Sequence, residues 1–328
     1  MTVSSPVSPR STTARRAVGM AAAAVVLASG AAACSSSNDA SGDGPCATTP
    51  ASKSDGARSI TVPDAEVTVL SPGEGPAQPL TVSPRTDAAQ RVTLETSSLE
   101  ASVAPTSRTE NTNQVQKTEQ QLVTPITARA VCDDPSSLEF SIGTPTSKDT
   151  ALDGLLGALD GSTGGISYAP GLVPTRLRLK PDESSESPAR SALEQSLVGA
   201  LDYAVPVPTT PVAPGARWQS VRTVSAAATV TQTMTVTLTA REGDILKLDV
   251  RVDETPVDSV FSIPGSDAKL HIAKFSMSGS GSLTVDLRSL LPVSGDLTMK
   301  GGRELTGDDP NRPILQQNEF TLTWRKSE

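Results

Sequence analysis

The sequence predicts a mainly β protein with antiparallel sheets and two short helices. Three observations point to this class. Apolar residues alternate with polar ones in many short segments, Gly, Pro and Asp separate these segments, and only two segments place apolar residues at helical spacing. One-sided alternation is typical of antiparallel sheets with a solvated face. A half-barrel, a sandwich and a pair of similar β units all fit this pattern.

The first β-rich half is expected at residues 58–180. Alternation is visible at Val92 and Leu94, at residues 138–142, and at Leu177 and Leu179, which lie between basic residues. Segments of this length with turn residues between them indicate short strands.

Two helical patterns interrupt the strands. The first places leucines at 152, 155, 156 and 159, and Gly161 is expected to end it. The second places apolar residues at 193, 197, 200 and 201. We expect it to begin behind a capping box formed by Ser191 and Glu194.

The second β-rich half is expected at 205–328, where a hairpin at 228–253 gives the clearest pattern. Its strands alternate apolar residues with threonines and then with charged residues, Gln232 alone breaks the apolar row, and the turn lies at 241–244. Further alternation follows at 283–287, 297–299 and 320–324. The apolar face is expected either to pack in a core or to bind an apolar or lipidic molecule, and includes Val230, Met234, Val236, Leu248 and Val250.

The N-terminus has the order of a secretion signal, which we assign to residues 1–33. Arg10, Arg15 and Arg16 precede an uncharged run of 17 residues, AVGMAAAAVVLASGAAA, that ends in small side chains. A membrane-spanning helix is disfavoured, because it needs about 20 strongly apolar residues. The paired arginines leave both the general and the twin-arginine export routes open.

Ala31-Ala32-Ala33-Cys34 resembles the lipobox of bacterial lipoproteins, although the first position is usually Leu. The thiol of Cys34 is expected to carry a diacylglyceryl group with acyl chains such as palmitate, and several chains anchor a protein durably where one does not. The sequence therefore predicts a lipoprotein of the cell envelope, anchored to the cell membrane on its extracytoplasmic face.

Lipid on Cys34 leaves two cysteines, Cys46 and Cys132, as an even pair. In an oxidising compartment such a pair is expected to form a disulfide bond, although two free thiols are the alternative. Residues 34–57 are rich in Ser, Thr, Gly, Asp and Pro and are expected to form a flexible tether before the domain at 58–328.

The net charge of the chain limits the kinds of partner that it can bind. The chain has a net charge of −8, and removal of residues 1–33 with their three arginines leaves 25 basic and 36 acidic side chains, hence −11. An acidic, aromatic-poor surface argues against nucleic acid, which requires basic patches and stacking rings. The same charge argues against flat electrostatic docking on anionic lipid, so the lipid anchor is expected to hold the protein at the membrane.

No motif indicates catalysis, a metal site or a cofactor. His271 is the single histidine, and a histidine-based metal site needs convergent partners. Ser266 and Lys269 match a Ser-x-x-Lys motif by chance, because its companion motifs are absent. Residues 278–282 (SGSGS) are interpreted as a flexible bend, and the pairs at 133–134 and 308–309 as turn aspartates. We therefore expect a non-catalytic protein.

Three segments carry a resemblance to a known family: Tyr203–Trp218 (YAVPVPTTPVAPGARW), Leu159–Gly161 with Gly171–Val173, and Gly281–Leu287 (GSLTVDL). They resemble an actinobacterial lipoprotein family of unknown function, in which P-x-G-x-x-W leads into a second β unit. More remotely, the architecture is similar to half-barrel envelope lipoproteins that carry lipids or lipidated partners. The resemblance implies lipid binding without a catalytic residue; the alternative is a structural lipoprotein that presents a β surface to another envelope component.

Overall fold

The computed structural model describes residues 45–48, 56–105, 113–225, 227–263, 265 and 267–327. The chain divides into two compact units, Met1–Asp39 and Ala40–Glu328, and every described residue belongs to the second. The expected signal peptide and Cys34 lie outside the described residues. Within the described part, no helix has both the length and the apolar character that crossing a membrane requires.

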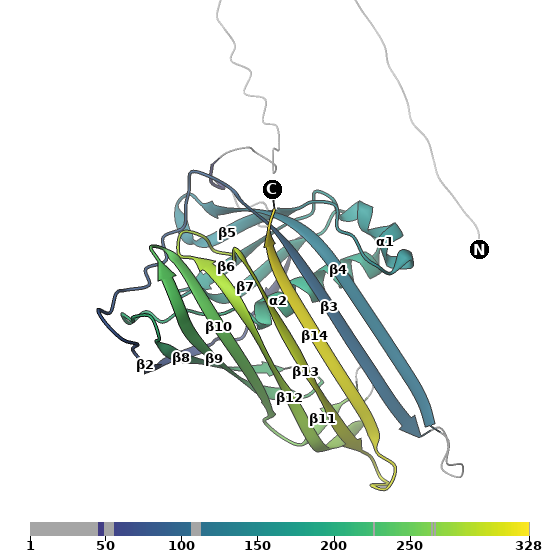
Figure 1. The fold of residues 1–328 in the computed structure, drawn as a ribbon. Coiled ribbons are helices and arrows are strands. Elements are labelled where there is room, and N and C mark those ends of the chain that lie inside the picture. The colour runs from purple at the N-terminus through teal and green to yellow at the C-terminus, as the bar shows by residue number, and fades with distance from the viewer. Residues whose placement is uncertain are drawn as a thin grey trace, which may run out of the picture. The chain divides into compact units, whose positions relative to one another are not determined.

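The second unit is built on one antiparallel sheet of 14 strands with two open ends, which confirms a mainly β fold with two short helices (Figure 1). Since there is one curved sheet and not two stacked ones, the half-barrel describes it and the sandwich does not. Hydrogen-bonded neighbours follow the order β1-β7-β6-β5-β4-β3-β14-β13-β12-β10-β9-β8-β2, and β11 pairs with β12. The strands are β1 (Arg58–Thr61), β2 (Glu66–Ser71), β3 (Gln90–Pro105), β4 (Asn113–Val131), β5 (Asp134–Ile142), β6 (Thr163–Ala169), β7 (Val173–Lys180), β8 (Arg217–Ser225), β9 (Thr229–Glu242), β10 (Ile245–Pro256), β11 (Val260–Ser262), β12 (Lys269–Asp286), β13 (Ser294–Thr306) and β14 (Ile314–Lys326).

The two β-rich halves share this sheet. Strands β3 to β7 form one block of neighbours and β8 to β14 form the other, and the pairing of β3 with β14 joins them. In that pairing Val92 lies opposite Lys326 and Val103 lies opposite Leu315. The last strand of the chain therefore lies in the middle of the sheet.

The first two strands lie at opposite edges of the sheet. β1 pairs with β7 and β2 pairs with β8, although only residues 62–65 separate β1 from β2. Val62 is buried and donates its backbone N–H to the carbonyl oxygen of Thr175 at 3.0 Å. One short segment thus links both edges, and the exposed edges are strands of only four and six residues. Short edge strands discourage pairing with other chains.

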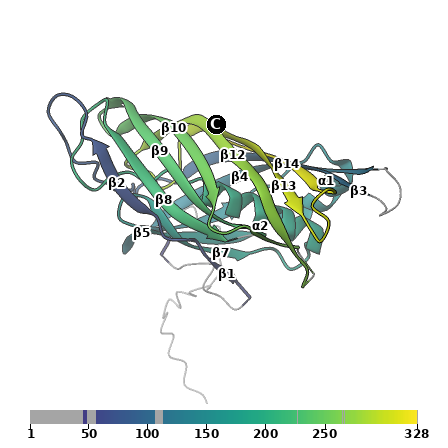
Figure 2. The same cartoon turned by 90° about the horizontal axis from the view of Figure 1, so that it is seen from below.

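Helix α2 (Ser187–Asp202) lies inside the curve of the sheet (Figure 2). Its buried side chains include Leu193 and Leu197, and Ser196 accepts a hydrogen bond from Thr96 of β3 at 2.8 Å. The amphipathic pattern thus predicted the helix, whose apolar residues belong to the same core as the sheet.

The predicted start of α2 was wrong. The helix begins at Ser187, four residues before Ser191, and Pro188 fills its first turn, where its fixed φ and missing N–H are tolerated. Ser191 is an exposed residue within the helix. Glu194 does not close a capping box and instead forms an ion pair with Arg58 of β1 at 2.8 Å.

The first helical pattern is confirmed as a short helix. Helix α1 (Thr150–Leu156) continues into the 3₁₀ turn η2 (Gly157–Leu159), and Asp149 caps α1 by accepting a hydrogen bond from the backbone N–H of Ala151. Gly161 follows with φ of +80°, a conformation that glycine adopts without strain.

Residues 278–282 do not form the expected bend. They lie within β12 and pair with β10 on one side and with β13 on the other. Gly279 and Gly281 face the backbone of β13 so closely that a Cβ atom at either position would overlap carbonyl oxygens of Thr298 or Asp296. The glycines therefore permit close approach of two strands and do not mark a loop.

The segment Pro214–Trp218 (PGARW) has a structural role. Gly215 has φ of +82°, and Trp218 is fully buried in β8, where its Nε1–H donates to the carbonyl oxygen of Pro206 at 2.8 Å. Val207 donates its N–H to the carbonyl oxygen of Gly171 at 2.8 Å. Two of the segments that carry the family resemblance are thus joined by a backbone hydrogen bond, and this contact is structural.

Candidate ligand-binding site

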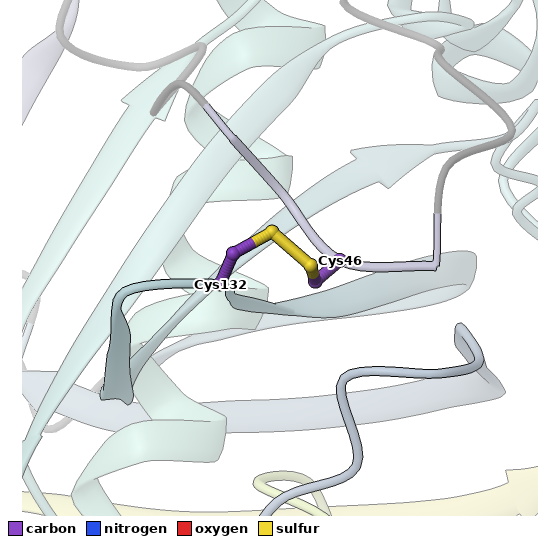
Figure 3. The surroundings of a disulfide bond; sticks show 2 residues. All are labelled: Cys46 and Cys132. Atoms are coloured by element: carbon purple, nitrogen blue, oxygen red, sulfur yellow. A yellow bond between two sulfur atoms is a disulfide. The ribbon is translucent and has the colours of Figure 1, made fainter.

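Cys46 and Cys132 form a disulfide bond, as predicted (Figure 3). Next to it, Ala47 donates its N–H to the carbonyl oxygen of Ala130 and accepts one from the N–H of Cys132, both at 3.0 Å. These bonds attach Cys46 and Ala47, which lie within the segment 34–57 expected to be a tether, to the C-terminal end of β4. The chain is therefore fixed to the sheet at this point, before residue 58.

The apolar face expected from the hairpin at 228–253 is buried. Each of its five side chains is at most 8 % exposed, and four of them belong to the main hydrophobic core with α2. In this structure the face packs in the core, which is one of the two outcomes expected from the sequence. An apolar ligand would have to use space elsewhere or displace part of that core.

A small apolar cavity lies between the end of α2 and the sheet. It holds about 40 Å³, enough for a few water molecules. Trp324, which is 6 % exposed, forms part of its wall. The other apolar walls include Leu172, Leu201, Leu283, Leu290, Leu291 and Leu322.

A larger cavity of about 360 Å³, here called the mouth, opens where β3, β5, β10 and β13 begin and where β4, β12 and β14 end. Leu290 lines both the mouth and the small apolar cavity. The apolar part of the mouth includes Val92, Ala128, Leu138, Leu290 and Val293, and its charged part consists of Arg85, Arg91, Arg129, Arg288, Lys326 and Asp286.

The charged part of the mouth is cationic, although the chain is acidic. Five of its six charged side chains are basic. Asp87 lies beside it and forms an ion pair with Arg85 at 2.9 Å. The hydrogen bond between these two side chains, supported by their charges, lowers the pKa of Asp87 and raises that of Arg85. Counting both aspartates, the mouth has a net charge of +3.

Two loops build the rim of the mouth. Ser83 and Arg85 donate their backbone N–H groups to the carbonyl oxygens of Leu287 and Arg288 at 2.8 and 2.9 Å. The side-chain amide of Gln90 donates to the carbonyl oxygen of Leu291 at 2.8 Å. The loop after β12 is thus held to β3 and to the preceding segment by hydrogen bonds, while its Leu287, Leu290 and Leu291 are buried in the main hydrophobic core.

A partly buried polar cluster lies at the C-terminal end of α2. Gln232, the break in the apolar row, donates to Glu254 at 3.2 Å, and Tyr203 donates to the same carboxylate oxygen at 3.0 Å. Burial raises the pKa of Glu254 despite these hydrogen bonds. Burial also raises the pKa of Asp202 to about 6; the charge of Arg222 opposes this shift and that of Glu254 adds to it.

Arg222 donates hydrogen bonds to carbonyl groups at the C-terminal end of α2. It is 3 % exposed and donates to the carbonyl oxygens of Leu201 and Ala204, both at 3.1 Å. A cation at a helix C-terminus interacts favourably with the unpaired carbonyl groups there. The cluster thus holds α2 against the sheet.

The other residues singled out in the sequence do not converge on a reactive centre. His271 is exposed in β12, and the aspartates at 134 and 309 accept hydrogen bonds from backbone N–H groups two residues later, as turn residues do. Ser266 lies outside the described residues. Across the ranges that the structure describes, no group of three or more His, Cys, Asp or Glu side chains is placed to hold a metal ion.

Comparisons with known proteins leave the chain without an assigned family. No protein-family model and no curated protein matches it. Among solved structures, one of botulinum neurotoxin type C, studied for its interaction with two ganglioside molecules, is 9 % identical and has a TM-score of 0.11, with 80 % of this chain and 89 % of that chain covered. A receptor binding domain is 10 % identical with a TM-score of 0.11, and the coverages are 80 % and 88 %. Likenesses this weak carry no argument about fold or function.

Proposed function

We propose that the chain is an exported, non-catalytic lipoprotein that is held at the cell membrane by lipid on Cys34 and binds an apolar or lipidic molecule in its curved sheet. The signal-like N-terminus and the lipobox support the anchor. The disulfide between Cys46 and Cys132 is consistent with an oxidising compartment outside the cytoplasm.

The observation that carries the binding proposal is the arrangement of the two cavities. The mouth has an apolar part, and Leu290 separates it from an apolar interior that includes Trp324. An acyl chain is far larger than the 40 Å³ of the interior cavity. It would enter by displacing the loop after β12, including the buried Leu290 that lines both cavities.

The two tryptophans provide a direct test of acyl-chain binding. Trp324 lines the interior cavity, whereas Trp218 is buried against Pro206 and lines neither cavity. Bromine atoms quench tryptophan fluorescence at short range, so dibrominated stearic acid should quench the fluorescence of residues 40–328 more than stearic acid does. Trp324→Phe should remove most of this difference and Trp218→Phe should leave it. Equal quenching in both variants, or none in either, would rule out the proposed path.

The anchor is tested separately. Cys34→Ala should move the protein from the membrane fraction to the soluble fraction of cells that export it, and Ser35→Ala should not. An unchanged distribution of the Cys34→Ala protein would overturn the assignment of the anchor, whatever the outcome of the quenching experiment.

A structural lipoprotein that contacts another envelope component is the second candidate, and one surface favours it. At the end of the sheet far from the mouth, Val103 lies between Val115 and Leu315 on neighbouring strands. Val115 is 70 % exposed and Leu315 is 49 % exposed. A photoreactive amino acid at Val115 should then capture a defined protein in cells, while one at Gln116, on the opposite face, should not.

A further inference from the structure

We infer that the mouth is a docking surface for anionic phospholipid headgroups, which turns this end of the domain toward the bilayer. The inference deepens the proposed function, because the anchor on Cys34 would supply the membrane. The net charge of −8 suggests neither binding to anionic lipid nor an orientation with the mouth toward the bilayer.

The first argument is local charge. The mouth has a net charge of +3 in a chain whose net charge is −8. Four of its five cations are arginines, whose planar guanidinium groups bind phosphate oxygens through two hydrogen bonds at once. Arg91, Arg288 and Lys326 are exposed and can approach a surface.

The second argument is the apolar part of the same cavity. Pro84, Ile245 and Val293 are partly exposed apolar residues that line the mouth together with the cations. A small hydrophilic anion gains nothing from such a wall, whereas the glycerol and upper acyl segments of a phospholipid do. The combination favours a lipid headgroup over free phosphate.

The third argument is where the tether joins. Cys46 is bonded to the end of β4, and Ala128, Arg129 and Ala130 of that end line the mouth. Eleven residues lie between Cys34 and Cys46, and the segment spans at most about 40 Å when fully extended. β4 has 19 residues and runs about 60 Å to the opposite end of the sheet. An anchor on Cys34 therefore keeps the mouth, and not the far end, near the bilayer.

Screening explains how an acidic domain can dock in this way. At an ionic strength of about 0.1 M the Debye length is about 10 Å, which is short compared with the length of the sheet. Acidic side chains at the far end are therefore screened from the bilayer, while the cations of the mouth interact with the headgroups at short distance.

The experiment uses residues 40–328, which contain every described contact, so that binding does not depend on the anchor. The protein is mixed at about 0.1 M salt with vesicles of phosphatidylcholine alone or of phosphatidylcholine and phosphatidylglycerol in equal parts, and bound protein is separated by flotation. We expect binding to the anionic vesicles only. Arg91→Gln with Lys326→Gln should lower the partition coefficient roughly 30-fold, since each basic residue near an anionic surface contributes about a factor of five.

The matched control is Arg176→Gln with Lys269→Gln, which removes the same charge from exposed positions away from the mouth. It should leave the partition coefficient within a factor of two or so of the unmodified protein. Equal losses in the two double variants would overturn the inference, as would equal binding to both kinds of vesicle. A third arm titrates the protein with inorganic phosphate: binding of phosphate without binding to anionic vesicles would assign the mouth to a soluble anion and overturn membrane docking.

Discussion

Replacing Asp202 by Asn removes a carboxyl group that burial at the end of α2 makes difficult to ionise. Its pKa rises from an ordinary value of 3.8 to about 6 in the folded protein. The folded state therefore binds the proton more tightly than the unfolded state does, and protonation stabilises the fold. This stabilisation is complete below about pH 4 and is lost as the pH rises to about 6. A rise of this size corresponds to about 3 kcal/mol, since a tenfold change is worth 1.36 kcal/mol.

The measurement is urea unfolding of residues 40–328 between about pH 4 and about pH 7. The free energy of unfolding of Asp202→Asn minus that of the unmodified protein should increase by about 3 kcal/mol over this range. Asp249→Asn, at an exposed position of β10, serves as the control for the loss of one carboxylate. Glu254 is present in all three proteins, so its own titration largely cancels. A difference for Asp202→Asn that is independent of pH would show that burial does not disfavour this charge.

Three further changes test individual contacts. Cys46→Ala with Cys132→Ala should lower the free energy of unfolding by about 4 to 5 kcal/mol in the chain-entropy account, because the bond closes a loop of 86 residues; an unchanged urea midpoint would contradict this. Gly171→Ala should destabilise more than Gly215→Ala in thermal unfolding. Both glycines have positive φ, which costs Ala about 1 to 2 kcal/mol, but only the first would press a Cβ against a carbonyl oxygen; equal losses would exclude that overlap. Trp218→Phe should cost about 1 to 3 kcal/mol in urea, since a buried carbonyl group loses its donor, and no loss would mean that water replaces it.

The strand content and the hairpin could be read from the sequence because each depends on local alternation. The turn at Gly243, with φ of +64°, and the pairing of β9 with β10 follow from that pattern. The order of the strands could not be read, because nothing local specifies that β14 pairs with β3 or that β1 and β2 lie at opposite edges. The glycines at 279 and 281 were misinterpreted for the same reason: their function is contact with a strand that is close only in three dimensions.

The mouth was missed because its residues come from the ends of many strands. Arg91, Arg129 and Lys326 each stand at an end of an apolar alternation, and from the sequence alone each is an ordinary solvated charge. Only the antiparallel register brings these ends together. Gln232 carried a stronger signal, since a lone polar residue in an apolar row requires a buried partner, here Glu254.

The position of β14 has a consequence for the order of folding. Its partners on either side are β3, more than 200 residues earlier, and β13. During synthesis the two blocks of strands can each begin to pair, but the seam between them forms only after β14 has been made. Contacts of such long sequence separation slow folding. A chain that lacks β14 would leave β3 and β13 as two long unpaired edges, so the 13 residues of β14 decide whether the sheet forms as one piece.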